Sequence, residues 1–245
     1  MTGSRWLPFG VPDRAAPRLF CFPHAGAGAA AFAEWRRLAP PEVQVCPLQP
    51  PGRAERMAET AHHDLDALLD DLLDDIGDEF TGRYALYGHS MGALVVFELT
   101  RRLRARGATP PAHLVVSGRT APQRRNPRRV LHTLSTAELV PELRRIGGTP
   151  EEVLTEPALL ELFLPTLRAD FAVNENYRYA EQAPLDVPLT VFGGDDDPRA
   201  TEEELGEWTA QAGAGCTVRV LPGDHFFLVP HAKELVTTAT GTLLG

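Results

Sequence analysis

A serine lies between two glycines in the stretch GHSMG, residues 88–92. The residues before it, Tyr84 to Tyr87, favour a strand, and the apolar spacing after it favours a helix. A serine on such a strand-to-helix turn presents its hydroxyl above a sheet, and the glycines allow neighbouring backbone to approach. The pattern alone is weak evidence, because it arises by chance and a serine can also cap a helix. Further residues must therefore support nucleophilic chemistry at Ser90.

A serine hydroxyl is a poor nucleophile unless a histidine takes its proton and an acid orients that histidine. In α/β-hydrolases the acid and then the histidine follow the serine in the chain. His225, in LPGDHFFL, comes directly after the last strand-like run and is our candidate base. His89 is interpreted as support for the turn, and His24 precedes the serine on an early loop.

Three consecutive aspartates follow the fifth strand-like run, in VFGGDDDPRA. A loop that leaves the end of a central strand is a suitable place for a site-facing carboxylate. We favour Asp197 as the acid, and Asp196 remains a competitor because the sequence does not show which side chain points inward. Asp224 would point away if its neighbour His225 points in. The alternative is a polar turn whose aspartates bond only to backbone amides.

An acyl-transfer site also needs donors for the developing oxyanion. The backbone N–H of Met91, at the start of the predicted helix, is one candidate. The small residues of PHAGAG, residues 23–28, follow an apolar strand and predict a second donor, the N–H of Ala25. A phosphate-binding loop is a poor alternative, because the Walker lysine and the third glycine of a dinucleotide site are both missing.

The elements that must position these residues alternate between strands and helices. Most of the strand-like runs are apolar almost throughout, which is typical of a sheet covered on both faces. They lie at Arg18 to Phe22, Val43 to Leu48, Tyr84 to Tyr87, His113 to Ser117, Leu189 to Phe192 and Thr217 to Leu221. The clearest helix is DLDALLDDLLDDIGDEF, with one leucine-rich stripe. This alternation predicts an α/β fold with a mostly parallel central sheet.

One region interrupts the alternation. Between about 124 and 183 no strand is evident, and helical patterns occur in TAELVPELRRI, in TPEEVLTEPALLELFLPTLRADF and in NENYRYAEQ. We interpret this region as a helical lid inserted into a single domain of residues 1–245. Apolar residues at helical spacing could pack the lid on the core and also contact a substrate; they are Leu160, Phe163, Leu164, Leu167 and Phe171.

Composition limits the possible partners. The formal net charge is −9, which argues against nonspecific binding to nucleic acid. No apolar run approaches the length of a membrane span, and the N-terminus lacks the pattern of a secretory signal, so we expect a cytoplasmic protein. The three cysteines have no CxxC spacing, and we expect no metal site. A monomer is the default expectation.

Six segments together resemble the type II thioesterases of polyketide and nonribosomal peptide biosynthesis. They are CFPHAGAGAAAF, PLQPPGRAER, YGHSMGALVVFEL, FLPTLRADF, VFGGDDDP and GDHFFL. The resemblance covers nearly the whole chain, although Gln49-Pro50 stands where the family often has a simpler LPGR-like run. It implies an α/β-hydrolase fold with a helical lid and the triad Ser90, Asp197 and His225.

The resemblance also implies an activity. Such an enzyme would hydrolyse acyl groups from the phosphopantetheine arm of acyl or peptidyl carrier proteins, as an editing step in antibiotic biosynthesis, and would need no cofactor. A carboxylesterase or an acyltransferase on the same fold remains an alternative. A basic cluster suggests a docking patch for an acidic carrier, although a solvated surface is the simpler interpretation. Its residues are Arg124, Arg125, Arg128 and Arg129.

Overall fold

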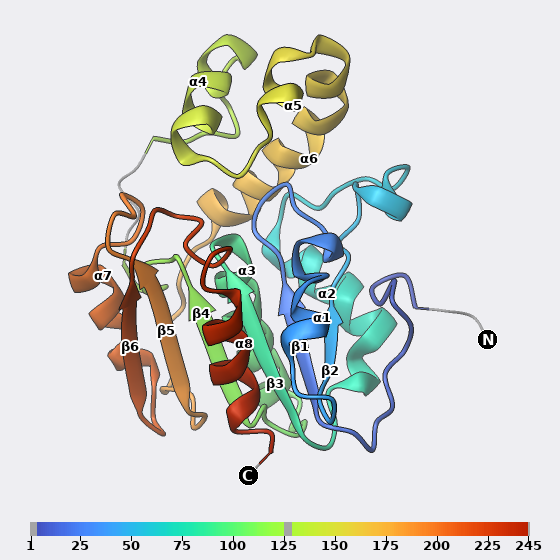
Figure 1. Ribbon diagram of the computed structural model, residues 1–245, viewed down its shortest axis with the longest axis vertical. Helices are drawn as coiled ribbons and strands as arrows, with labels where there is room; N and C mark the ends of the chain where they lie inside the picture. Colours follow the sequence, from blue (N-terminus) through green and yellow to red (C-terminus); the bar gives the residue numbers. More distant parts are fainter. Residues whose placement is uncertain (1–3, 125–128, 245) are drawn as a thin grey trace.

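The computed structural model describes residues 4–124 and 129–244. Its centre is a six-stranded sheet in the order β2-β1-β3-β4-β5-β6, in which every neighbouring pair is parallel (Figure 1). The strands are β1 Arg18–Phe22, β2 Gln44–Pro47, β3 Tyr84–His89, β4 His113–Ser117, β5 Leu189–Gly194 and β6 Cys216–Leu221. The predicted mostly parallel α/β architecture is confirmed.

Helices follow the strands and cover both faces of the sheet. The α-helices are α1 Trp35–Leu38, α2 Leu65–Ile76, α3 Met91–Ala105, α4 Thr136–Ile146, α5 Glu151–Thr155, α6 Pro157–Asn176, α7 Glu202–Gly206 and α8 Ala232–Gly241. Short 3₁₀ helices are η1 Ala29–Phe32, η2 Ala54–Arg56, η3 Gly77–Glu79 and η4 Glu207–Gln211. The N-terminus of α2 is capped by Asp64, whose side chain accepts a hydrogen bond from the Ala67 amide.

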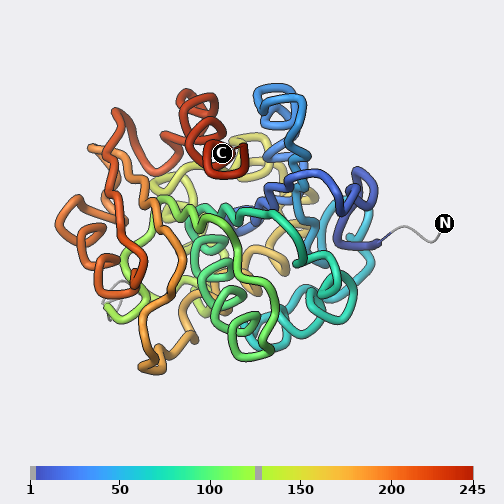
Figure 2. Tube along the Cα trace, turned by 90° about the horizontal axis from the view of Figure 1, so that it is seen from below, coloured from blue at the N-terminus to red at the C-terminus, as the bar shows by residue number. Residues whose placement is uncertain are grey.

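Alternate residues of each strand enter two separate cores. Phe20 and Leu86 pack beneath α2 and α3, whereas Leu19 and Tyr87 pack beneath α1 and α8. Figure 2 shows α8 and α3 on opposite sides of the sheet. The first core also contains Trp6 and Trp208, and the second contains Trp35. This double cover explains why the strand sequences are apolar on both faces.

Three helices, α4, α5 and α6, lie between β4 and β5 in the chain and stand above the sheet in Figure 1. They share a third apolar cluster that includes Leu139, Leu143 and Leu167. The helix α6 runs from this group down to the core and contains Pro165. Because proline has no N–H, the helix loses one backbone hydrogen bond there.

The prediction that NENYRYAEQ is helical is wrong beyond its first three residues, since α6 ends at Asn176. The following backbone is held away from a helical path by side chains of α3. The Arg101 side chain donates to the Ala180 carbonyl, and the Arg104 side chain donates to the Ala183 and Pro184 carbonyls at 2.9 Å each. These tertiary contacts outweigh a local helical preference.

Across residues 4–124 and 129–244, no helix is both long enough and apolar enough to cross a bilayer.

Candidate active site

The turn between β3 and α3 holds Ser90 in a strained conformation. Ser90 has a φ of 55° and a ψ of −112°, an arrangement that non-glycine residues rarely adopt. Its backbone N–H donates to the Ser117 carbonyl at 2.8 Å, which ties the turn to the end of β4. The side chain is half-buried and projects from the end of a central strand.

The two glycines flanking the serine leave room for backbone. A Cβ on Gly88 would lie 2.1 Å from the Gly92 carbonyl oxygen, and a Cβ on Gly92 would lie 2.3 Å from the Phe22 carbonyl oxygen. Neither approach is possible for a larger residue without moving β1 or α3. The GxSxG spacing is therefore a steric requirement of this turn.

His225 links the serine to an aspartate. Its Nε2 lies 3.0 Å from the Ser90 Oγ, and its Nδ1 lies 2.8 Å from the Asp197 Oδ2. Asp197 and His225 are 4% and 3% exposed. The second carboxylate oxygen, Oδ1 of Asp197, accepts the Arg199 backbone N–H at 2.8 Å. The three side chains form a continuous chain of hydrogen bonds in the order a nucleophile, a base and an orienting acid require.

The competing aspartates face elsewhere. Asp196 and Asp195 are exposed, and the Asp195 Oδ1 accepts the Gly223 backbone N–H at 2.8 Å. Asp224 is exposed, and its Oδ1 accepts the Phe226 backbone N–H at 2.7 Å. Of the aspartates considered in the sequence, Asp197 is the one brought to His225.

Two further histidines pack beside His225. The His89 ring lies 4.9 Å from the His225 ring, between centroids, and its Nδ1 is 2.8 Å from the Ser117 Oγ. Burial, followed by the neighbouring His225, holds the pKa of His89 well below its usual value. Burial likewise lowers the pKa of His24 to about 4, with smaller effects of His225 and Arg53. Both rings are therefore neutral near pH 7.

The loop after β1 reaches the same place as the serine. Ala25 and Met91 both line the small cavity that contains Ser90 and His225. Met91 is the first residue of α3, where a helix leaves its amides without carbonyl partners within the helix. The next residue of the loop, Gly26, donates its N–H to the Asp170 Oδ2 at 2.7 Å. The two predicted oxyanion donors thus belong to segments that meet at Ser90.

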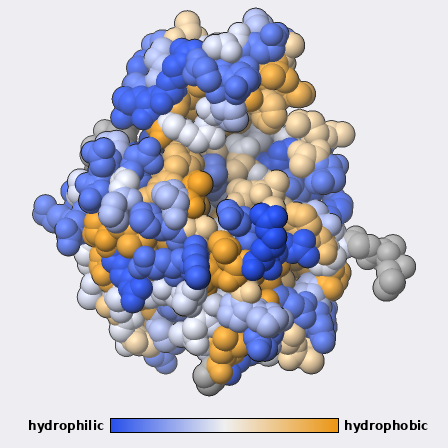
Figure 3. Space-filling view, in the orientation of Figure 1, coloured by the Kyte–Doolittle hydropathy of each residue, from blue (hydrophilic) through white to orange (hydrophobic). Residues whose placement is uncertain are grey.

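Residues of α6 cover this cavity. Leu167 and Phe171 line it, and Phe163 lines an adjoining cavity of about 170 Å³ that also borders His24 and Ala25. All five predicted apolar residues belong to or pack against the third apolar cluster, and Leu160 and Leu164 line neither of these two cavities. The surface in Figure 3 is hollowed between the helices above the sheet and the rest of the molecule. The five predicted apolar residues therefore divide into three groups: two line the serine cavity, Phe163 lines the adjoining one, and two line neither.

The basic cluster lies partly outside the described residues, which exclude Arg125 and Arg128. The Arg124 side chain pairs with Glu204 at 3.3 Å and with Glu207. The Arg129 side chain pairs with Glu138 at 2.8 Å and with Glu142 at 3.6 Å. Both described arginines thus already have carboxylate partners.

Sequence reasoning missed a buried ion pair beside the loop that follows β1. Arg53 and Asp170 are 4% and 3% exposed, and they form two hydrogen bonds of 2.7 and 2.8 Å. Both residues stand in segments that carry the family resemblance, but their separation of 117 positions gives no local signal of contact. Among the described residues, no cluster of three or more histidine, cysteine or acidic side chains is arranged to hold a metal ion.

Comparison with known proteins identifies relatives in one family. A family model described as a thioesterase domain matches residues 17–242. The gramicidin S biosynthesis protein GrsT of Aneurinibacillus migulanus is 41% identical over 226 residues, which are 92% of this chain and 88% of that protein.

Solved structures agree with the sequence relatives. The type II thioesterase BorB from the borrelidin biosynthetic cluster is 34% identical, with a TM-score of 0.89 and 99% of both chains covered. The RedJ thioesterase from the prodiginine pathway of Streptomyces coelicolor is 38% identical, with a TM-score of 0.86, and the match covers 97% of this chain and 92% of that one.

Proposed function

The chain belongs to the thioesterase domain family, and from this premise we propose that it is an editing enzyme acting on carrier proteins. Its relatives are type II thioesterases of nonribosomal peptide and polyketide pathways, and it is a hydrolase acting on thioesters. The proposed substrate is an acyl group held as a thioester on the phosphopantetheine arm of an acyl or peptidyl carrier domain. The observation that carries the proposal is the bridging of Ser90 and Asp197 by His225.

The first half of the proposed mechanism is acylation. His225 Nε2 takes the Ser90 proton as Oγ attacks the thioester carbonyl carbon, and Asp197 holds the proton on Nδ1. The tetrahedral intermediate collapses, and the C–S bond breaks. His225 returns its proton to the thiolate of the carrier arm, which leaves as a thiol.

The second half is deacylation. A water molecule gives a proton to His225 and attacks the acyl-serine, which releases a carboxylic acid and restores Ser90. In both halves the amides of Met91 and Ala25 stabilise the oxyanion, each contributing about 3 kcal/mol to the lowering of the barrier. Every step uses only side chains and backbone amides, so the mechanism requires no metal or organic cofactor.

The acyl group would lie against α6. Leu167 and Phe171 line the serine cavity, and Phe163 lines the adjoining one, so an acyl chain leaving Ser90 could contact all three. Leu164 supports them from the third apolar cluster. In this proposal the helices between β4 and β5 act as the lid, which excludes water from the reacting carbonyl.

Carrier docking is assigned to the arginine cluster predicted from the sequence. Arg124 and Arg129 are the described members of the cluster, and Arg125 and Arg128 complete it in the sequence. An acidic carrier would compete with Glu204 and Glu138 for these guanidinium groups. We therefore expect the cluster to contribute modestly to affinity and mainly to the rate of association.

The test compares one acyl group in three forms: on a carrier protein, on a small thiol and as an oxygen ester. Wild type and Ser90→Ala are assayed side by side by release of the free acid. We expect the carrier-bound thioester to react fastest and Ser90→Ala to be inactive on all three. Faster reaction of the oxygen ester would identify a carboxylesterase, and transfer of the acyl group to an added alcohol or amine would identify an acyltransferase. Activity retained in Ser90→Ala would remove the triad assignment.

A further inference from the structure

One face of α6 packs against the loop that carries Ala25 and forms a hydrogen bond with it. A Cβ on Gly26 would lie 2.5 Å from the Leu167 Cδ2, so Leu167 packs directly on this glycine. One turn later, the Asp170 Oδ2 accepts the Gly26 backbone N–H at 2.7 Å. Gly26 also has a φ of 79°, a conformation that glycine adopts without strain. Leu167 and Asp170 therefore fix the residue next to the proposed oxyanion donor.

Asp170 is itself held in place by Arg53. The guanidinium donates to both carboxylate oxygens, at 2.7 and 2.8 Å, and to the Ala27 carbonyl at 3.0 Å. Its Nε donates to the Pro51 carbonyl at 3.1 Å. The bidentate geometry fixes the plane of the carboxylate as well as its position. Arg53, Asp170 and the loop at 26–27 thus form one closed hydrogen-bonded unit.

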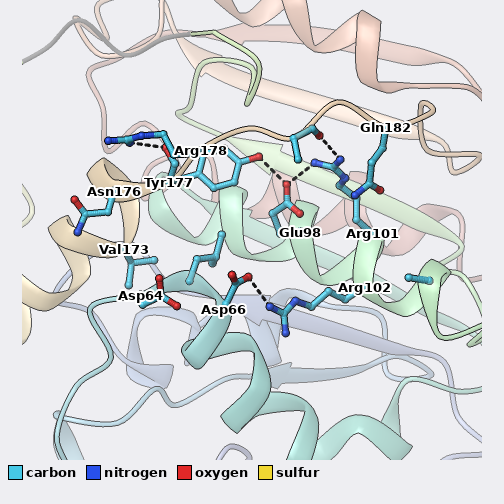
Figure 4. Close-up of a pocket in the computed structure, with 13 residues that line it drawn as sticks. Asp64, Asp66, Glu98, Arg101, Arg102, Val173, Asn176, Tyr177, Arg178 and Gln182 are labelled. Carbon is cyan, nitrogen blue, oxygen red and sulfur yellow. Dashed lines mark hydrogen bonds and ion pairs between the residues drawn. The ribbon is translucent and has the colours of Figure 1, made fainter.

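A second contact anchors Tyr177, the residue directly after α6, to α3, the helix that follows Ser90. The Tyr177 hydroxyl donates to the Glu98 Oε1 at 2.7 Å, and the Arg101 side chain donates to the same oxygen at 2.7 Å. Figure 4 shows Tyr177 and Arg101 pointing toward Glu98 at the wall of a cavity of about 480 Å³. The segment of α6 after Pro165 is therefore fastened both to the oxyanion loop and to α3.

Stability alone is a weak reason for burying Arg53 and Asp170. Desolvation of two buried charges offsets most of their attraction, and replacement of such pairs by apolar residues is often neutral or stabilising. The pair instead places a fixed acceptor beside the loop of small residues after β1. That acceptor orients the loop before substrate arrives, which is how a preorganised donor lowers a barrier.

We propose that Asp170, fixed by Arg53, is a positioning residue that aims the oxyanion loop at the reacting carbonyl. The inference rests on the proposed function, in which the Ala25 amide is an oxyanion donor. It makes α6 part of the catalytic apparatus: the helix covers the acyl group and also sets the geometry of the oxyanion hole. Displacement of α6 would then lower the rate of the chemical step as well as expose the cavity.

The experiment uses a small soluble acyl thioester, so that carrier docking plays no part. Wild type is compared with Asp170→Asn and with the double variant Arg53→Met/Asp170→Leu, which removes both charges. Glu175→Gln is the matched control, because Glu175 lies on the same helix and accepts the Leu131 and His132 backbone amides at 2.8 and 3.1 Å. Each variant is also unfolded in urea.

Two inhibitors separate positioning from substrate binding. A trifluoromethyl ketone forms a bond from its carbonyl carbon to the Ser90 oxygen, His225 takes the serine proton, and the resulting oxyanion occupies the oxyanion hole. A thioether analogue of the substrate lacks the carbonyl oxygen and binds without using that hole. Loss of oxyanion stabilisation lowers affinity for the first inhibitor and leaves the second unchanged.

We expect Asp170→Asn to lower kcat roughly 10- to 100-fold with little change in KM, somewhat less than the outright loss of one oxyanion donor. Ketone affinity should fall by the same factor, while thioether affinity and Glu175→Gln activity stay at wild-type values. The double variant should have a higher free energy of unfolding than Asp170→Asn, and its kcat should stay as low as that of Asp170→Asn. The inference is overturned if the double variant regains wild-type kcat, if ketone affinity does not fall, or if Glu175→Gln is equally slow. Failure of wild type itself to hydrolyse the thioester would instead refute the proposed function, and the inference with it.

Discussion

Asp197 uses both of its carboxylate oxygens, one for the Arg199 backbone amide and one for the His225 ring. The first bond fixes the orientation of the carboxylate, and the second determines which ring nitrogen of His225 carries the proton. The Nε2 is thereby left free to accept a proton from Ser90. The role proposed for Asp197 is therefore control of a tautomer, which an uncharged side chain of the same shape would lose.

Asp197→Asn should lower kcat about 10³- to 10⁴-fold with a small effect on KM, because the amide can donate to Nδ1 and favour the wrong tautomer. The measurement is steady-state hydrolysis of a soluble thioester near neutral pH. Asp196→Asn is the control, since Asp196 is exposed, and it should stay within about twofold of wild type. Equal losses in the two variants would contradict the assignment of Asp197.

The candidate site could be predicted from sequence only where each residue has a local marker. Ser90 has its flanking glycines, and His225 has its place after the last strand. The choice between Asp196 and Asp197 has no such marker, because it depends on how the turn after β5 rotates its side chains. Arg53 and Asp170 lie 117 positions apart and meet only when α6 has packed on the loops of the core.

At the scale of elements, β3, its turn and α3 form the rigid part of the site. Ser90 keeps a positive φ because Gly88 and Gly92 let the turn approach β1. The stored strain is balanced by the fully buried packing of β3 and most of α3. The geometry of the nucleophile therefore depends on the absence of a Cβ atom at Gly88 and at Gly92.

Gly92→Ala should abolish measurable activity and lower the free energy of unfolding by roughly 2 kcal/mol or more, since the new Cβ would overlap the Phe22 carbonyl oxygen. Gly241→Ala is the matched control: Gly241 ends α8, and a Cβ there meets nothing within 4 Å. That variant should be fully active and equally stable or slightly more stable. Urea unfolding and thioester hydrolysis measure both effects, and an active Gly92→Ala would contradict the steric argument.

Elements were predictable where local pattern and tertiary environment agree. Most strands are apolar almost throughout, and TAELVPELRRI forms α4 over its whole length, 136–146. Residues 177–182 have a helical composition but bond to α3 instead. The local sequence of this segment gives no sign of these contacts, because the residues that it bonds to, Glu98 and Arg101, belong to another helix.

For the whole molecule, charge bears on the proposed docking of a carrier protein. The net charge of −9 repels an acidic partner, so the proposed docking of a carrier requires a local positive region. Arg124→Glu/Arg129→Glu should lower kcat/KM for a carrier-bound substrate several-fold and leave a small thioester unaffected. Arg219→Glu is the control, because Arg219, on β6, is exposed and pairs with Glu234 of α8 at 3.5 Å. Similar losses on both substrates would argue against docking at this cluster.

Acid should destabilise the fold through its buried histidines. Burial, aided by His225 and Arg53, lowers the pKa of His24 from 6.5 to about 4, and burial also lowers the pKa of His89 and of His113. The unfolded chain then binds protons that the folded chain does not, so the free energy of unfolding falls as pH drops from about 6.5 to 4. The contribution of His24 is at most about 3 kcal/mol.

His24→Asn should flatten this pH dependence, as measured by urea unfolding at intervals between pH 7 and pH 4. The exposed His63 supplies the control, and His63→Asn should leave the slope unchanged. Identical slopes for wild type and His24→Asn would show that His24 is not the group being titrated.

The distribution of tryptophan has an optical consequence. Trp6, Trp35 and Trp208 are 0%, 2% and 0% exposed, all in the cores on either side of the sheet. The sequence has three tryptophans in total, so none lies between positions 124 and 183. The maximum of tryptophan emission will therefore lie at short wavelength in the native protein. It will move to longer wavelength only when one of the two cores unfolds and exposes its tryptophans to water. Movement of α4, α5 and the first half of α6 away from the sheet will leave the emission maximum unchanged. The wavelength of that maximum therefore distinguishes lid opening from unfolding of a core.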